Sequence, residues 1–149
     1  MSDVQLDDWN YEDGTKYHAW SAYGRAKTTS IFFTEALASK LHTRHVDSVS
    51  LDPGSIKTNL QVYLTPEMRE EGIKTIETNT GRPFSASELK TIGQGCSTIL
   101  VAALDPTLPS GSFLGDCIVA APEVYARDQE KAELLWALSE RLVGQTFEW

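Results

Sequence analysis

Ser21-Ala-Tyr-Gly-Arg-Ala-Lys27 places a phenol and an ammonium four residues apart in a stretch that is typical of a helix. Residues four apart share one face of a helix, so the side chains of Tyr23 and Lys27 are expected to be neighbours. A cation held beside a phenol favours the phenolate, which lets the oxygen exchange a proton near neutral pH. The pair therefore suits proton transfer to a carbonyl or from an alcohol.

A second segment, downstream of this pair, supports a functional interpretation of Tyr23 and Lys27. Alone, a tyrosine and a lysine at this spacing are typical of an aromatic at the edge of a core and a solvated lysine one turn later. The run Val46-Asp-Ser-Val-Ser-Leu-Asp-Pro-Gly-Ser-Ile-Lys-Thr-Asn-Leu60 has the pattern of an apolar strand that ends in a Pro-Gly turn. Together the two segments resemble the short-chain dehydrogenase/reductase family. The resemblance extends from about Val4 to the C-terminus and is to the C-terminal half of a fungal, retinol-dehydrogenase-like member.

This resemblance implies roles for particular residues. In the family, the tyrosine that matches Tyr23 is the catalytic acid/base, and the lysine that matches Lys27 holds the nicotinamide ribose and supports ionisation of the tyrosine. The segment after the strand lies along the nicotinamide, with Ile56 and Thr58 at positions that contact its carboxamide region. The candidate catalytic residues are therefore Tyr23 and Lys27. The candidate cofactor-binding residues are Tyr23, Lys27, Pro53, Gly54, Ile56 and Thr58.

The sequence also departs from the family. Family members open with a strand, a Gly-rich turn and a helix that hold the cofactor pyrophosphate, and this chain shows no such pattern. Gly93 and Gly95 form a Gly-x-Gly, but it lies inside a predicted helix with no strand before it, so close helix packing is expected instead. The catalytic serine is also missing, and Ser2 is a poor substitute at its place near the terminus.

The fold class that follows is α/β. The resemblance implies the C-terminal portion of a Rossmann-like doubly wound parallel sheet, incomplete without its N-terminal half. Residues 1–149 are taken as a single partial domain of four segments. These are a helix with the Tyr-x-x-x-Lys pair (16–43), a strand and Pro-Gly turn (45–60), a segment like the family's substrate lid (61–83), and a helix, last strand and C-terminal helix (85–149).

Capping signals and periodicity predict the bounds of the elements. Ser85 and Glu88 form a capping box that would begin the third helix. Two tryptophans near the C-terminus, Trp136 and Trp149, are expected to be packing residues. The expected elements are a helix from about Trp20 to His42, a strand from about His45 to Leu51, a short helix from Pro66, a helix from Ser85 to Leu104, a strand from Phe113 to Ala120 and a C-terminal helix from about Pro122 to Val143.

The first of these helices bears on partners. It is predicted to carry Tyr23 and Lys27 on the same stripe as Ile31, Thr34 and Leu41. The family uses this helix for dimerisation, so the resemblance implies a homo-oligomer, or pairing with a full-length relative, through residues 20–42.

Composition excludes several classes of function. The chain has 149 residues, 41% of them hydrophobic and 23% charged, which fits one globular unit. A net charge of −8 argues against nucleic acid or an anionic membrane as a partner. No stretch approaches the ~20 apolar residues of a membrane span, and the acidic start is unlike a signal peptide, so the expected location is the cytoplasm.

Metal and disulfide chemistry are not predicted either. His42 and His45 have no third ligand at metal spacing, so no metal site is expected. Cys96, in a predicted helix, and Cys117, in a predicted strand, are expected to be buried thiols rather than a disulfide.

Three functions are compatible with these residues. The first is an NAD(P)-dependent short-chain oxidoreductase that acts on a carbonyl or secondary alcohol, with its N-terminal half absent through truncation. NADP is favoured over NAD as its cofactor, and the fungal resemblance suggests secondary metabolism. The second is a redox-neutral acid/base catalyst, an isomerase or cyclase, that uses Tyr23 without a cofactor. The third is an inactive remnant that pairs with a full-length relative.

Overall fold

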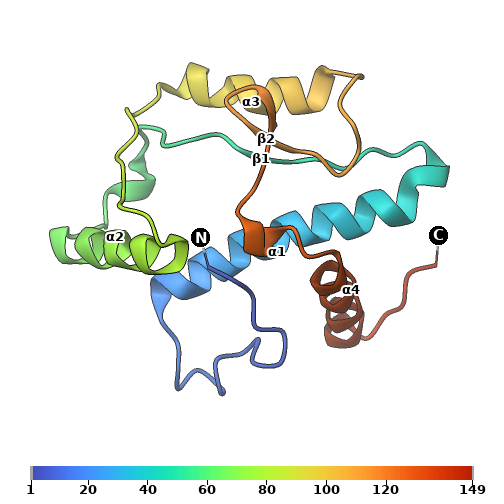
Figure 1. Cartoon of the computed structure of the whole chain (residues 1–149), viewed down its shortest axis with the longest axis horizontal. Helices are drawn as coiled ribbons and strands as arrows, with labels where there is room; N and C mark the ends of the chain where they lie inside the picture. The colour runs from blue at the N-terminus through green and yellow to red at the C-terminus, as the bar shows by residue number, and fades with distance from the viewer. Residues whose placement is uncertain (1, 149) are drawn as a thin grey trace.

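The computed structural model describes residues 2–148, which fold into helices on both sides of a small sheet (Figure 1). The α/β class is confirmed. Trp149 lies outside the described residues. The α-helices are α1 (Ala19–Leu41), α2 (Pro66–Thr80), α3 (Ile92–Leu104) and α4 (Gln129–Val143), the strands are β1 (Ser50–Asp52), β2 (Phe113–Gly115) and β3 (Ile118–Ala120), and the 3₁₀ turns are η1 (His42–Arg44), η2 (Asn59–Gln61) and η3 (Val124–Ala126).

Helix α1 lies where the sequence predicts it. The side chain of His18 caps its start by accepting a hydrogen bond from the Ser21 backbone N–H at 3.2 Å. The prediction that Tyr23 and Lys27 share one stripe of the helix with Ile31 is wrong. Ile31 is buried, whereas Tyr23 and Lys27 are exposed. Each step of four residues turns about 40° beyond a full circle. After two such steps, the position of Ile31 has rotated from the solvent side to the core.

The sheet is mixed rather than parallel. Strand β1 pairs parallel with β2, with Leu51 opposite Leu114, and β2 pairs antiparallel with β3. The chain reverses at Asp116 and Cys117, whose φ angles of 50° and 66° are those of a tight hairpin turn. The predicted single strand from Phe113 to Ala120 and the purely parallel sheet are therefore wrong.

The third helix begins later than predicted. Thr91 caps α3 by accepting from the Gln94 backbone N–H, and the Gln94 side chain accepts in turn from the Thr91 N–H. The predicted start at Ser85 with Glu88 is wrong, because residues 85–90 form no helix. The last of them, Lys90, bonds through its backbone to the loop that follows β1. A backbone committed to that loop cannot also form the first turn of a helix.

The remaining helices agree more closely with the sequence. Helix α2 begins at Pro66, as predicted, and continues to Thr80, where Gly81 ends it with φ of +65°. The amphipathic C-terminal helix is confirmed as α4, although it begins only after its N-cap Asp128.

The two cysteines are free thiols, as expected, but neither is fully buried, which differs from the prediction. Cys96 is exposed on α3, which contradicts the prediction that it is buried. Cys117 is half-buried in the hairpin turn and not in a strand, with its sulfur 3.6 Å from Thr98 Oγ1.

The main core lies between α1 and α4, where Phe32 is fully buried and Trp136 is nearly so. A second buried centre is Leu114 of β2, which also has no exposed surface. Helices α1 and α3 both contact β1 and lie on opposite sides of the strands (Figure 1). The main cluster consists of Val4, Phe32, Ala36, Ala132 and Trp136. Among residues 2–148, no helix has both the length and the apolar character needed to cross a bilayer.

Adjacent phenylalanines on α1 test this packing. Phe32→Ala is expected to lower the free energy of unfolding by about 3–4 kcal/mol, because it leaves a cavity in the main cluster. Phe33→Ala is the matched control: Phe33 is 45% exposed and stacks on Trp136 at 5.5 Å, so its loss should cost about 1 kcal/mol. Denaturant titration followed by circular dichroism measures both values. Equal losses would contradict the packing described.

Candidate functional site

Tyr23 and Lys27 lie together on the solvent side of α1, as their spacing predicts. The Nζ of Lys27 is 5.4 Å from the centroid of the Tyr23 ring, and 55% of Tyr23 is exposed. The ammonium thus faces the π surface of the phenol, an arrangement in which cation and ring attract each other. The structure brings together a proton donor and a cation that are both open to an incoming molecule.

Helix α2 is fastened to the start of α1 beside this pair. The ring of Trp20 meets Tyr23 edge to face at 6.3 Å, and its Nε1 donates to the Met68 carbonyl of α2 at 2.9 Å. Gly72 permits the close approach, since a Cβ there would lie 2.9 Å from the Trp20 ring. His18 Nε2 lies 2.9 Å from Glu71 Oε1. The segment predicted to resemble a substrate lid therefore borders Tyr23.

A small pocket of about 80 Å³ lies between α1 and α2 at this place. Ser2 is buried on its wall, where its hydroxyl accepts from Asn79 Nδ2 at 2.8 Å and its carbonyl from Thr28 Oγ1 at 2.8 Å. Ser2 and Tyr23 thus line one pocket, although they are distant in sequence. The lining residues are Ser2, Trp20, Tyr23, Gly24, Gly72, Thr75, Ile76 and Asn79.

The second group of candidates forms the loop after β1. Gly54 has a φ of +81°, which only glycine adopts readily, and its N–H donates to Asp52 Oδ1 at 2.8 Å. Ile56 packs against α3, and Thr58 Oγ1 caps η2 by accepting from the Leu60 N–H at 3.2 Å. Both side chains predicted to face the cofactor therefore also have structural contacts.

Lys90 is the residue in this loop region that the sequence reasoning missed. Its Nζ donates to the Pro53 carbonyl at 3.2 Å and pairs with Asp116 of the hairpin turn. The sequence predicts a helix at Lys90, and no regular spacing relates Lys90 to Pro53, so the sequence does not predict this contact.

The two groups of candidates remain separate. Among residues 2–148, no hydrogen bond, ion pair or ring contact joins Tyr23 or Lys27 to residues 53–58. Strand β1 connects them indirectly, because it packs on α1 and leads into the loop. The acid/base pair and the loop are therefore two separate groups, which β1 links through the backbone.

The Gly-x-Gly of α3 does not suit a pyrophosphate. It lies within the helix, and a Cβ on Gly95 would overlap the Cδ1 of Ile56. The predicted close packing is confirmed for Gly95. It is wrong for Gly93, where an added Cβ would meet no atom within 4 Å.

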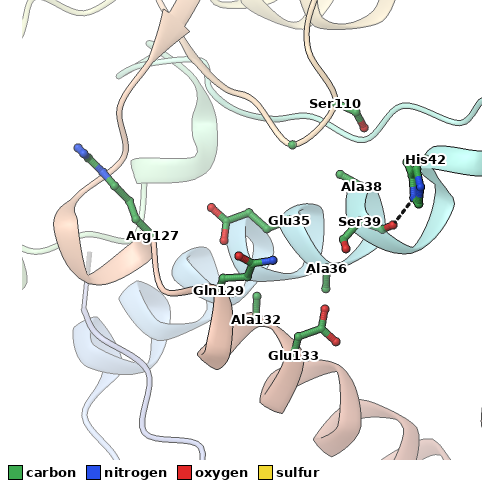
Figure 2. Close-up of a pocket in the computed structure, with 11 residues that line it drawn as sticks. Glu35, Ala36, Ala38, Ser39, His42, Ser110, Arg127, Gln129, Ala132 and Glu133 are labelled. Atoms are coloured by element: carbon green, nitrogen blue, oxygen red, sulfur yellow. Dashed lines mark hydrogen bonds between the residues drawn. The ribbon is translucent and has the colours of Figure 1, made fainter.

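A larger pocket, of about 420 Å³, lies between α1, the start of α4 and the Ser110–Gly111 turn (Figure 2). None of the candidate site residues lines it. Burial, and next the nearby carboxylate of Asp128, raise the pKa of Glu35 on its wall above the ordinary value. Its lining residues are Glu35, Ala36, Ala38, Ser39, His42, Ser110, Gly111, Arg127, Gln129, Ala132 and Glu133.

The two glycines of α3 give a matched test of how tightly the loop packs. Gly95→Ala is expected to lower the free energy of unfolding by about 1–3 kcal/mol, because Ile56 must move. Gly93→Ala should raise it by about 0.5–1 kcal/mol, because alanine favours the helix and meets open space. Thermal unfolding of both variants decides, and a stabilised Gly95→Ala would contradict the Ile56 contact.

Glu35 makes stability depend on pH. Since its folded-state pKa is raised, the folded protein loses stability as the pH rises from the ordinary value of 4.5 through the raised one. Glu35→Gln removes this loss, so the variant should be more stable than the wild type at neutral pH by about 0.5 kcal/mol, and the gain should vanish at acidic pH. Melting curves across the pH range measure it. The control Glu133→Gln breaks the ion pair with Lys40 and should give no such gain.

Comparisons with known proteins show what this chain is similar to. No protein-family model matches the chain. It is 31% identical to the short-chain dehydrogenase/reductase prx1 of Penicillium roqueforti, over 97% of this chain and 44% of that protein. It is 30% identical to retinol dehydrogenase 14 of Homo sapiens, over 95% of this chain and 40% of that protein. The WW domain-containing oxidoreductase of Homo sapiens is 32% identical, over 87% and 29%.

A solved structure supports the fold. The crystal structure of an uncharacterised protein from Mycobacterium paratuberculosis matches with a TM-score of 0.57 at 22% identity, over 98% of this chain and 47% of that one. The chain spans less than half the length of the curated relatives described above. It is therefore a relative of the short-chain dehydrogenase/reductases and aligns with the C-terminal part of these proteins.

Proposed function

We propose that this chain carries the acid/base pair of an NAD(P)-dependent oxidoreductase that acts on a carbonyl or a secondary alcohol. The observation that carries the proposal is the contact between Tyr23 and Lys27 on the exposed face of α1, at 5.4 Å from Nζ to ring centroid. The names of the relatives, which are dehydrogenases, reductases and an oxidoreductase, support redox chemistry.

In this proposal Tyr23 moves the proton. Its hydroxyl donates to the substrate oxygen when a carbonyl is reduced and accepts the proton back when an alcohol is oxidised. The Lys27 ammonium stabilises the phenolate that remains after donation, because opposite charges at short distance attract. A bound nicotinamide cofactor would supply or accept the hydride at the carbonyl carbon.

The proposal assigns the nicotinamide end of such a cofactor to Lys27 and to the loop after β1. Lys27 is exposed and could bond the ribose, while the loop with Pro53, Gly54, Ile56 and Thr58 would lie along the ring. Loop backbone held in one conformation can receive a planar group without a further ordering cost. The Gly-x-Gly of α3 would not hold the pyrophosphate, so the proposal concerns the nicotinamide end alone.

Two further features of the proposal concern context. Within the proposal NADP is favoured over NAD as the cofactor, and the resemblance to fungal members suggests a role in secondary metabolism. Self-association, or pairing with a longer relative, would use the face of α1 that carries Ala26, Ser30 and Phe33, all of which are exposed.

A tyrosine pair tests the chemistry. Tyr23→Phe is expected to lower the rate of NADPH-dependent carbonyl reduction by about 100-fold or more, because the proton donor is lost. The matched control Tyr17→Phe removes a phenol that is 63% exposed and should leave the rate unchanged. Absorbance of NADPH, with a panel of aldehydes and ketones, reports the rate.

Calorimetric titration with NADPH and with NADH must accompany the assay. Saturable binding of one cofactor per chain, together with loss of activity in Tyr23→Phe, supports the proposal. Turnover that depends on Tyr23 without cofactor binding would replace it by redox-neutral acid/base catalysis. Absence of both activity and cofactor binding, with a complex formed only with a longer relative, would replace it by the interaction function.

A further inference from the structure

Lys90 contacts the loop after β1 with both its backbone and its side chain. Its N–H donates to the Ser55 carbonyl at 2.8 Å, and its carbonyl accepts from the Lys57 N–H at 3.0 Å. Its Nζ donates to the Pro53 carbonyl at 3.2 Å. One residue thus binds three positions of the loop that carries the candidate cofactor-binding residues.

We propose that Lys90 is a positioning residue, which holds the loop from Pro53 to Thr58 in its cofactor-facing conformation. This inference rests on the proposed function, because it takes that loop as the nicotinamide-facing one. Lys90 acts through the loop and is not placed against a substrate or a reacting atom.

The first argument is the close approach at Gly54. A Cβ on Gly54 would lie 2.7 Å from the Lys90 Nζ and 2.9 Å from its Cε, so the lysine side chain occupies the space that a larger residue would fill. Gly54 also has a left-handed backbone, with φ of +81°. The conformation of the turn therefore depends on two residues: Gly54 adopts the left-handed backbone, and the Lys90 side chain packs directly against it.

The second argument is the ion pair with Asp116. Asp116 lies in the turn between β2 and β3 with φ of 50°, and its carboxylate accepts from Lys90 Nζ. Only 25% of the Lys90 side chain is exposed, compared with 81% for that of Asp116. Bonds from an ammonium to a carbonyl and a carboxylate are stronger than neutral ones. Lys90 therefore ties the loop after β1 to the hairpin of the neighbouring strands.

These contacts predict the effect of removing the Lys90 side chain. The backbone bonds to Ser55 and Lys57 need no side chain, so a variant keeps the bridge but loses the fastening at Pro53 and Asp116. The loop then samples more conformations before a cofactor binds. The apparent affinity for the cofactor falls in proportion to the fraction of molecules whose loop is in the binding conformation. Loss of the side chain should weaken cofactor binding more than it slows the proton transfer by Tyr23.

The first experiment measures the loop without any cofactor. Hydrogen exchange of the amides of Gly54 and Lys57, followed by NMR, is expected to become about 10-fold faster in Lys90→Met. Lys90→Arg should restore most of the protection, and Asp116→Asn should give an intermediate value. Lys16→Met, which removes an exposed lysine paired with Glu12, should leave both amides unchanged. Circular dichroism confirms that each variant is folded.

Exchange that is unchanged in both Lys90→Met and Asp116→Asn would overturn the proposal. So would faster exchange that spreads evenly over α1 and α4, because that result indicates a general loss of stability. If Lys90→Met fails to fold, Asp116→Asn and Lys90→Arg still decide between a fastened and an independent loop.

The second experiment links the loop to the cofactor. The dissociation constant for NADPH should rise about 10-fold in Lys90→Met and recover in Lys90→Arg, while kcat changes by less than about threefold. A fall in kcat at unchanged KM would overturn the positioning role. If the wild-type chain binds neither NADPH nor NADH, the proposed function fails, and the exchange measurements alone decide whether Lys90 holds the loop.

Discussion

Helix α1 is the element on which the other parts of the molecule are placed. Its C-terminal half buries Phe32 against α4, and its N-terminal half presents Trp20 to the backbone of α2 at Gly72. Between these contacts it covers one side of β1 (Figure 1). A helix of 23 residues can span all three only if its apolar face stays continuous. The buried positions from Gly24 to Leu41 supply that face.

The elements that the sequence predicts well are those with local signals. Helix α1 has its periodic face, α2 has Pro66 at its start, and α4 has an amphipathic pattern. Start and end signals of this kind act within a few residues. The sequence does not predict the hairpin turn at Asp116, because two non-glycine residues adopt left-handed backbone there. The sequence does not predict the start of α3 either, because the segment before it bonds to a loop more than thirty positions earlier in the chain.

The same distinction applies to the candidate site. A spacing of four residues predicts that the side chains of Tyr23 and Lys27 are neighbours, and they are neighbours in the structure. The position of Lys90 on the Pro53 carbonyl, and that of Ser2 beside the pocket of Tyr23, follow from tertiary packing. No periodicity in the sequence relates residues so far apart. Sequence reasoning therefore found the chemical groups, and the structure supplied what holds and surrounds them.

The exposure of Tyr23 has a consequence for how its chemistry could be controlled. At 5.4 Å, a cation beside an aromatic ring in open water is strongly screened, since the interaction of charges scales inversely with the dielectric constant. A molecule that covered the exposed side of α1 would displace this water and lower the local dielectric constant around the pair. Under the proposed function, the bound molecule would therefore itself complete the surroundings in which the proton moves.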